Sequence, residues 1–270
     1  MKKHLSRIGF ILLILLTNPP AGFPAEAALS AKAIVEKAVA AAYYQGKDGR
    51  AQVSMSITDA QHRKRTRRFT LLRRNVSGAG VIGDQQFYVY FHRPADVKKM
   101  VFMVLKKIDK DDDRWLYLPA LDLVKRIAAS DERTSFVGSH FFYEDVSGRG
   151  MDEDVHELLE ETDQYYVIQS RPKKPDAVEF AYYKNWVDKK TFLPMKAEYY
   201  KNDDRAYRRY TVLKVELIDG HPTAVHSEMK DLIGGGKTVL NYAKVKYDIG
   251  LPETIFSERY LRRAPRKYLR

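Results

Sequence analysis

From Tyr165 onward the chain repeats one unit, a run of about ten residues rich in strand-forming side chains followed by a short turn signal. A short turn between two strands joins them as antiparallel neighbours. The repeated spacing therefore predicts an antiparallel meander, in which each strand pairs with the next one along the chain. The turn signals are Asp188-Lys189, Asn202-Asp203-Asp204, Asp219-Gly220 and Gly234-Gly235-Gly236.

The first half of the chain carries strand signals of the same kind. Apolar side chains alternate with polar ones over residues 53–57, 69–71 and 87–91, and this alternation is typical of a half-buried strand. The 18 Tyr and 12 Phe also favour strands, because aromatic side chains suit a pleated surface. We count roughly ten or eleven strands and two or three helices, which predicts a mainly β fold with one curved sheet or barrel.

Three segments are expected to be helical. Ser30 can cap an Ala-rich helix that runs to about Ala42. The acidic stretch 151–162 is expected to form one or two helical turns, and Pro252 to open a short helix that reaches Leu261. No repeat or low-complexity linker divides the sequence, so we expect residues 28–270 to form a single domain.

One expected strand is apolar on both faces. Val101, Met103 and Leu105 alternate, but Phe102 and Val104 between them are apolar as well. A strand of this kind has apolar material on each side. One side is expected to be a core or lid, and the other a cavity or a partner.

Residues 1–27 have the pattern of a cleaved secretory signal. Lys2, Lys3 and Arg7 precede the apolar run 8–16, and Ala25-Glu26-Ala27 provides the small residues of a cleavage site. The apolar run is too short to span a bilayer, which takes about 20 residues. We therefore expect a protein exported to the periplasm.

The chain is basic, with 47 Lys and Arg against 35 Asp and Glu and a net charge of +12. Two clusters concentrate this charge, residues 62–68 and the basic residues of 262–270. In an exported protein such clusters favour anionic lipid headgroups or an acidic docking surface over nucleic acid. A solvated face that keeps the protein soluble is the alternative.

The sequence offers little for catalysis or metal binding. It contains no Cys, which excludes disulfides, thiolate zinc sites and thiol nucleophiles. The acidic spacing of residues 109–113 starts like a calcium loop, but Arg114 stands where that loop requires Gly. Ser139 and His140 are an isolated neighbouring pair. We therefore expect no enzyme activity, no metal and no cofactor.

Residues 114–149 carry the most specific pattern. It reads W-x-Y-L-P-x5-K-R and then S-F-x-G-S-x-F-x-Y-E-D, and it resembles the outer-membrane lipoprotein-sorting proteins of the LolA-like superfamily. Within that superfamily it is similar to the branch often encoded beside resistance–nodulation–division-type lipid exporters. His140 and Phe142 depart from the family pattern. The matching residues are Trp115, Tyr117, Leu118, Pro119, Lys125 and Arg126, then Ser135, Phe136, Gly138, Ser139, Phe141, Tyr143, Glu144 and Asp145.

The resemblance implies an incomplete, strongly curved antiparallel barrel, with helices over its open mouth and a concave face that binds acyl chains. Three polar residues of the motif, Arg126, Glu144 and Asp145, are expected to form either a buried ion pair between strand and lid or a surface bridge. The cavity candidates are Phe87, Val89, Phe91, Val101, Met103, Leu105, Trp115, Tyr117, Phe136 and Phe141. Several of these aromatic residues could equally be plain core.

These observations favour a periplasmic carrier that binds the acyl chains of lipids or lipoproteins and moves them toward the outer membrane. Its expected partners are an inner-membrane exporter of the resistance–nodulation–division type and an outer-membrane acceptor, and we expect a monomer. The alternative is an adaptor subunit of such an exporter that encloses no ligand. A periplasmic hydrolase is a third hypothesis, with only Ser139 and His140 in its favour.

Overall fold

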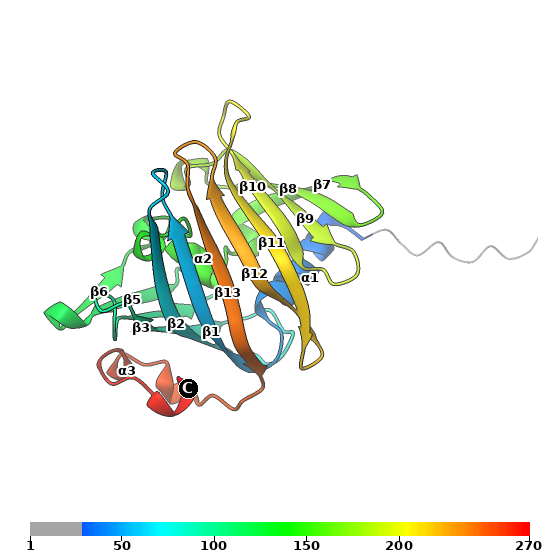
Figure 1. Cartoon of the computed structure of the whole chain (residues 1–270). Helices are drawn as coiled ribbons and strands as arrows, with labels where there is room; N and C mark the ends of the chain where they lie inside the picture. The colour runs from blue at the N-terminus through cyan, green and yellow to red at the C-terminus, as the bar shows by residue number, and fades with distance from the viewer. Residues whose placement is uncertain (1–28) are drawn as a thin grey trace, which may run out of the picture.

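The main element of the computed structural model, which describes residues 29–270, is one antiparallel sheet of thirteen strands (Figure 1). The sheet curls but stays open, with β6 and β7 as its two edges. The strand order is β6-β5-β4-β3-β2-β1-β13-β12-β11-β10-β9-β8-β7. The strands are β1 (Asp48–Thr58), β2 (Lys64–Asn75), β3 (Gln85–Arg93), β4 (Val101–Lys106), β5 (Asp113–Leu118), β6 (Leu123–Ile127), β7 (Asp154–Glu161), β8 (Tyr165–Pro172), β9 (Tyr182–Asp188), β10 (Pro194–Tyr200), β11 (Ala206–Ile218), β12 (His221–Asp231) and β13 (Lys237–Tyr247).

The chain starts the sheet in the middle, builds outward to one edge, and then returns from the opposite edge to the middle. β1 pairs with β13, and from β1 the chain runs strand by strand to the edge β6. Residues 128–153, here called the strap, then lead to the opposite edge, β7, and the chain returns strand by strand to β13. The strap contains α2 (Tyr143–Ser147). It therefore connects the two edges of an open, curled sheet.

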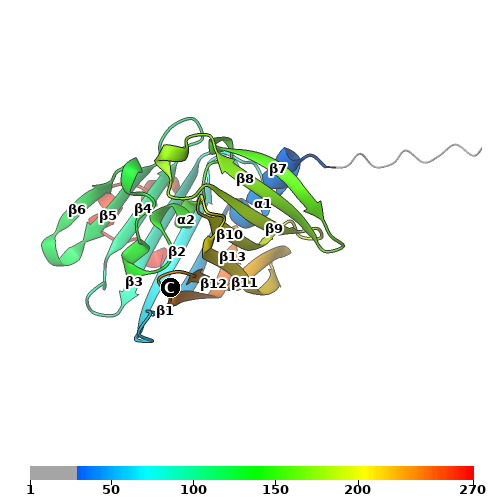
Figure 2. The ribbon, with the colours of Figure 1, turned by 90° about the horizontal axis from the view of Figure 1, so that it is seen from above.

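Two helices lie inside the curl. α1 (Ala31–Tyr43) is capped by Ser30, whose hydroxyl accepts a hydrogen bond from the Ala33 N–H at 3.2 Å. Its buried residues Ile34 and Ala38 pack with Ile168 of β8. Figure 2 shows α1 and α2 between the two halves of the sheet. These two helices occupy the mouth, as expected.

An aromatic cluster on the concave face joins the strap to the first half of the sheet. The ring of Phe136 lies 5.4 Å from that of Phe102 on β4, 6.0 Å from that of Phe91 on β3 and 5.5 Å from that of Tyr143. Aromatic pairs at such spacing stabilise beyond the area they bury. This part of the concave face is therefore filled with side chains.

The opposite, convex face of the same strands is covered by residues 249–269, which contain α3 (Arg259–Arg262). Val101 and Met103 of β4 pack there against Phe256 and Leu261. Side chains alternate between faces along a strand, so Phe102 and Val104 point to the concave core instead. The expected strand with two apolar faces thus lies between the concave core and the chain's own C-terminal segment.

The expected mainly β fold with one curved antiparallel sheet is confirmed, with thirteen strands rather than ten or eleven. The helical turns expected over 151–162 are mostly wrong, because Asp154–Glu161 form edge strand β7. Pairing with β8 prevails there over the helix preference of Glu and Leu. The helix expected to reach Leu261 is a short turn at Glu253–Ile255 followed by α3, and α3 lies on the convex face rather than over the mouth.

The secretory signal expected at residues 1–27 lies outside the described residues and stays a prediction. Within residues 29–270, none of the helices has the length and apolar composition needed to cross a membrane.

Candidate functional site

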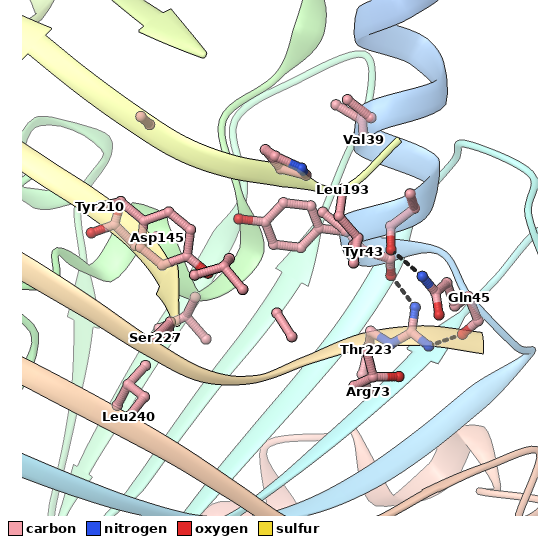
Figure 3. Close-up of a pocket in the computed structure, with 18 of the residues that line it drawn as sticks. Val39, Tyr43, Gln45, Arg73, Asp145, Leu193, Tyr210, Thr223, Ser227 and Leu240 are labelled. Atoms are coloured by element: carbon pink, nitrogen blue, oxygen red, sulfur yellow. Dashed lines mark hydrogen bonds between the residues drawn. The ribbon is translucent and has the colours of Figure 1, made fainter. Parts of the chain in front are cut away.

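A cavity of about 390 Å³ lies on the concave face, bordered by α1, the strap and both halves of the sheet (Figure 3). This volume falls within the range of about 300–1,000 Å³ that is usual for ligand sites. Val39 of α1, Leu193 before β10 and Leu240 of β13 contribute apolar groups from three directions. The space is therefore one that several distant segments create together.

Strand alternation explains which side chains reach the cavity from the first half of the sheet. On β2, Phe69, Leu71 and Arg73 line it, and on β3, Phe87 and Val89 do. All five occupy odd positions, and residues two apart share a face of a strand. The even positions face the convex side.

One end of the cavity is polar and is organised by Arg73. Its guanidinium donates to the backbone carbonyls of Tyr43 and Gln45, at the end of α1 (Figure 3). Gln85 donates to the Tyr43 carbonyl as well, at 2.8 Å. These donors satisfy carbonyls that a helix terminus leaves without partners, and the cation suits the negative end of the helix dipole. Arg73 therefore fixes α1 to the sheet.

Tyrosine hydroxyls supply part of the remaining polarity. Tyr43, Tyr199, Tyr210 and Tyr242 all border the cavity. Burial raises the pKa of each, that of Tyr199 to about 12. These hydroxyls are therefore uncharged at neutral pH, so that they add hydrogen-bonding groups to an apolar lining without adding charge.

The strap is fastened to the second half of the sheet by a buried ion pair. Arg208 of β11, 4% exposed in its side chain, pairs with Asp145 of α2. The guanidinium also lies 3.9 Å from the centre of the Phe142 ring, a cation–π distance. Breaking such a pair leaves a buried charge without compensation. The pair therefore holds α2 over the cavity.

A second buried network begins at Glu144. Its carboxylate pairs with Arg133 and, at 3.1 Å, with Arg149. Arg149 continues to Asp154 at 3.0 Å, and Arg133 to Glu179 at 2.6 Å. The network therefore joins the strap to β7 and to the segment before β9.

Glu179 is the carboxyl group of this network whose pKa is lowered. Burial acts to raise its pKa, but hydrogen bonds and charge from Arg133, with a further bond from the Tyr207 hydroxyl, lower the pKa to about 2. Glu179 is therefore ionised throughout the physiological pH range.

The structure places four of the ten cavity candidates at the cavity: Phe87, Val89, Phe136 and Phe141. Phe91 lies beside them in the aromatic cluster of the concave core, where its ring is 5.1 Å from that of Phe69. It does not border the cavity.

The other five candidates face the convex side, which corrects the expectation that they line the cavity. Val101, Met103 and Leu105 of β4 and Trp115 and Tyr117 of β5 all pack in the cluster formed with the C-terminal segment. Their apolar character serves that contact. If the inward face of a strand is assigned wrongly by one residue, every side chain of the strand is placed on the opposite face. The sequence alone did not determine which face of β4 and β5 points inward.

The expected grouping of Arg126 with the two motif carboxylates is also corrected. Arg126 is 69% exposed in its side chain and pairs with Asp113 of the neighbouring strand. Asp145 pairs instead with Arg208, 63 residues away, and Glu144 with Arg133 and Arg149 of the strap itself. Glu144 is buried and Asp145 half-buried, and both hold the strap, whereas Arg126 forms a surface bridge.

The neighbouring Ser139 and His140 do not form a nucleophile–base pair. The Ser139 hydroxyl bonds to the backbone of Phe141, and His140 Nδ1 lies 2.8 Å from the Thr238 hydroxyl. Within residues 29–270, one group of carboxylates comes close enough to suggest a metal ion, that of Glu132, Glu144 and Glu153. Each of the three is paired with an arginine, so the group is part of an ion-pair network; the partners are Arg114, Arg133 and Arg149.

Several residues of the site were not predicted from the sequence. Arg73, Arg133 and Arg208 are spread along the chain, and their carboxylate or carbonyl partners are 11 to 68 residues away. One signal was available for Arg208: it shares a strand face with the inward-facing Tyr210. The contribution of α1 to the cavity had no such signal.

Comparisons with known proteins agree with this geometry. A model for a family of uncharacterized proteins matches residues 83–263. A DUF1329 family protein from Desulfovibrio piger has a crystal structure with a TM-score of 0.75 and 29% identity, over 84% of this chain and 95% of that one. No curated protein matches the chain.

Two further similar crystal structures are those of an outer-membrane lipoprotein-sorting domain and of a LolA superfamily protein. A domain from Vibrio parahaemolyticus, assigned to the outer-membrane lipoprotein-sorting proteins, has a TM-score of 0.76 and 27% identity, over 86% of this chain and 98% of that one. A LolA superfamily protein from Nitrosomonas europaea has a TM-score of 0.66 and 22% identity, over 86% of this chain and all of that one. The similarity to the Nitrosomonas europaea protein shows that the two proteins share a fold.

Proposed function

Because the chain belongs to the family of uncharacterized proteins whose model matches residues 83–263, and its structure is similar to that of an outer-membrane lipoprotein-sorting domain, we propose that it is a carrier of acyl chains. The cargo is a lipid or the lipid part of a lipoprotein, held in the cavity beneath the strap. The carrier works in the periplasm, receives its cargo from an inner-membrane exporter and delivers it toward the outer membrane. It performs no covalent chemistry.

The observation that carries the proposal is the cavity itself. Its side chains are mostly apolar, and its tyrosines are neutral at neutral pH because burial raises their pKa. A mostly apolar space of this size, whose charged lining groups such as Arg73 and Asp145 are bound by protein partners, suits a hydrocarbon chain better than a polar ligand. Four residues predicted from the sequence would contact the acyl chain of the cargo: Phe87, Val89, Phe136 and Phe141.

Hydrocarbon burial supplies enough free energy for capture. Each methylene group transferred from water contributes about 0.8 kcal/mol, so ten of them contribute about 8 kcal/mol before the costs of association. Release then requires either a movement that opens the cavity or a tighter acceptor. The strap is the element placed to move, since it crosses the cavity and is held by ion pairs.

The adaptor hypothesis has less support. An adaptor that encloses no ligand would be expected to fill its concave face with side chains. The aromatic cluster around Phe136 fills only part of that face, and about 390 Å³ beside it is open.

The proposal is tested by titrating the protein with a fluorescent fatty acid and displacing the probe with an unlabelled one. Ala197 of β10 is buried and borders the cavity, so Ala197→Phe fills the space that the bound acyl chain would occupy. We expect saturable binding by the unmodified protein and at least tenfold weaker binding by this variant. Ala177→Phe adds the same ring at an exposed position and should bind normally.

Circular dichroism establishes that both variants are folded before their binding is compared. Absence of probe binding by the unmodified protein would remove the proposal. Equal binding by the two variants would show that the probe attaches somewhere other than the cavity.

A further inference from the structure

The two basic clusters of the sequence meet on the convex face of the sheet. The Thr70 hydroxyl of β2 donates a hydrogen bond to the backbone carbonyl of Leu269 at 3.1 Å, and it lies 2.9 Å from Nε2 of His92 on β3. The His92 ring is 5.0 Å from that of Tyr90, whose pKa is raised by burial and lowered in part by the nearby charge of Arg266. Residues near 68, 92 and 268 are therefore neighbours in space.

Seven cations surround this junction, and we call them the basic convex patch. Alternation along β2 puts Lys64 and Arg68 on the same face as Thr70, and Arg93 stands opposite Arg68 in the register of β2 and β3. Arg68, Arg93 and Lys98 also border one shallow depression. All seven side chains are exposed: Lys64, Arg68, Arg93, Lys98, Arg266, Lys267 and Arg270.

The charge of the patch is not balanced from within. Among residues 29–270, no carboxylate forms an ion pair with any of the seven. Segments 62–70, 92–99 and 264–270 together contain one acidic residue, Asp96, which lies 3.9 Å from Arg67. Elsewhere on the surface exposed arginines do have partners, as Arg262 has Asp122. The patch therefore presents positive charge that only another molecule can neutralise.

The surroundings of the patch fit a layer of lipid headgroups better than a protein. Protein interfaces are centred on apolar or aromatic anchors that become buried. None of the large exposed apolar side chains of residues 29–270 lies in the three segments that form the patch. A headgroup layer needs only unpaired cations near its surface, and guanidinium groups match phosphate geometry well.

We propose that the basic convex patch docks the protein on membranes that contain anionic phospholipid. This docking is separate from cargo binding, because the patch lies on the convex face and the cavity on the concave one. It would hold the carrier reversibly at the membrane surface through an electrostatic attraction, which salt weakens.

The test is co-sedimentation of the full chain with vesicles of phosphatidylcholine alone or of phosphatidylcholine mixed with phosphatidylglycerol. We expect binding only to the mixed vesicles, and its loss when salt is raised from about 0.1 M to about 1 M, where the Debye length falls from about 10 to about 3 Å. The triple variant Arg68→Glu, Lys98→Glu and Lys267→Glu, with one change in each segment, should bind at least about 100-fold more weakly.

The matched control is the triple variant Lys173→Glu, Lys174→Glu and Lys190→Glu, which makes the same change in net charge at exposed lysines away from the patch. It should keep most of the binding, and so should Ala197→Phe, in which the cavity is filled. Equal losses of vesicle binding in the two triple variants would show that binding depends only on net charge, and this would overturn the proposal. Binding to polyglutamate without binding to anionic vesicles would overturn it in favour of an acidic protein partner.

Discussion

Asp145 of α2 and Arg208 of β11 form a buried ion pair across the concave face, although 63 residues separate them in the chain. The pair brings the strap against the second half of the sheet, while the Phe136 cluster binds the strap to the first half. The cavity lies between these two attachments. Its shape therefore depends on interactions that the strap makes in both directions.

Replacing Arg208 with Ala should strongly destabilise the fold, because the half-buried Asp145 carboxylate would lose its counter-charge. We expect a loss of about 3–5 kcal/mol in the free energy of unfolding, measured with urea. Arg126→Ala is the control, since it removes an exposed pair with Asp113 and should cost less than about 1 kcal/mol. Similar losses in the two variants would contradict the role given to the buried pair.

Glu179 should make stability depend on pH in the acid range. Its pKa is lowered to about 2 in the folded protein from an ordinary value of 4.5, so its contribution is complete above pH 4.5 and is lost as the pH falls toward 2. Glu179→Gln should therefore be less stable than the unmodified protein at pH 7, and the difference should shrink between pH 4.5 and 2. A constant difference in unfolding free energy over that range would disagree with the lowered pKa.

A side chain at Gly148 should destabilise the fold, because Tyr43 of α1 packs directly on it. Its φ is +75°, and a Cβ there would lie 2.8 Å from the ring of Tyr43. Gly250 has a similar φ of +72° with open space around it, so Gly250→Ala measures the backbone effect, about 1–2 kcal/mol. Gly148→Ala should cost at least about 1 kcal/mol more by urea unfolding. Equal costs would mean that α1 moves away freely.

The convex cluster should support stability without taking part in cargo binding. Leu261 is 1% exposed and packs with Val101 and Met103. Leu261→Ala should cost about 2–5 kcal/mol in unfolding free energy. Its affinity for a fluorescent fatty acid, measured on the folded protein, should stay within about twofold of the unmodified value. A large loss of affinity would place the convex face in the binding site.

Local features of the fold could be predicted from the sequence, because each depends on a few neighbouring residues. Ser30 as a helix cap, alternation along β1 to β3 and the turn signals after Tyr165 are of this kind. β7 was not predicted, because its Glu- and Leu-rich sequence favours a helix and only pairing with β8 makes it a strand.

The site could be predicted only in part, for the same physical reason. The motif 114–149 pointed to the strap and to Phe136 and Phe141, which border the cavity. It could not say that Trp115 and Tyr117 face the convex side, since the partner there, residues 249–269, is more than 130 residues away. Nor could it supply Arg208 as the partner of Asp145. Long-range packing decides both.

Native mass spectrometry of the protein, purified from cells without denaturation or detergent, tests the central claim most directly. The carrier account predicts a population heavier than the bare chain by the mass of an acyl lipid, and it predicts that Ala197→Phe lacks this population while Ala177→Phe keeps it. Detection of the bare chain alone, together with no binding of added fatty acid, would contradict the account.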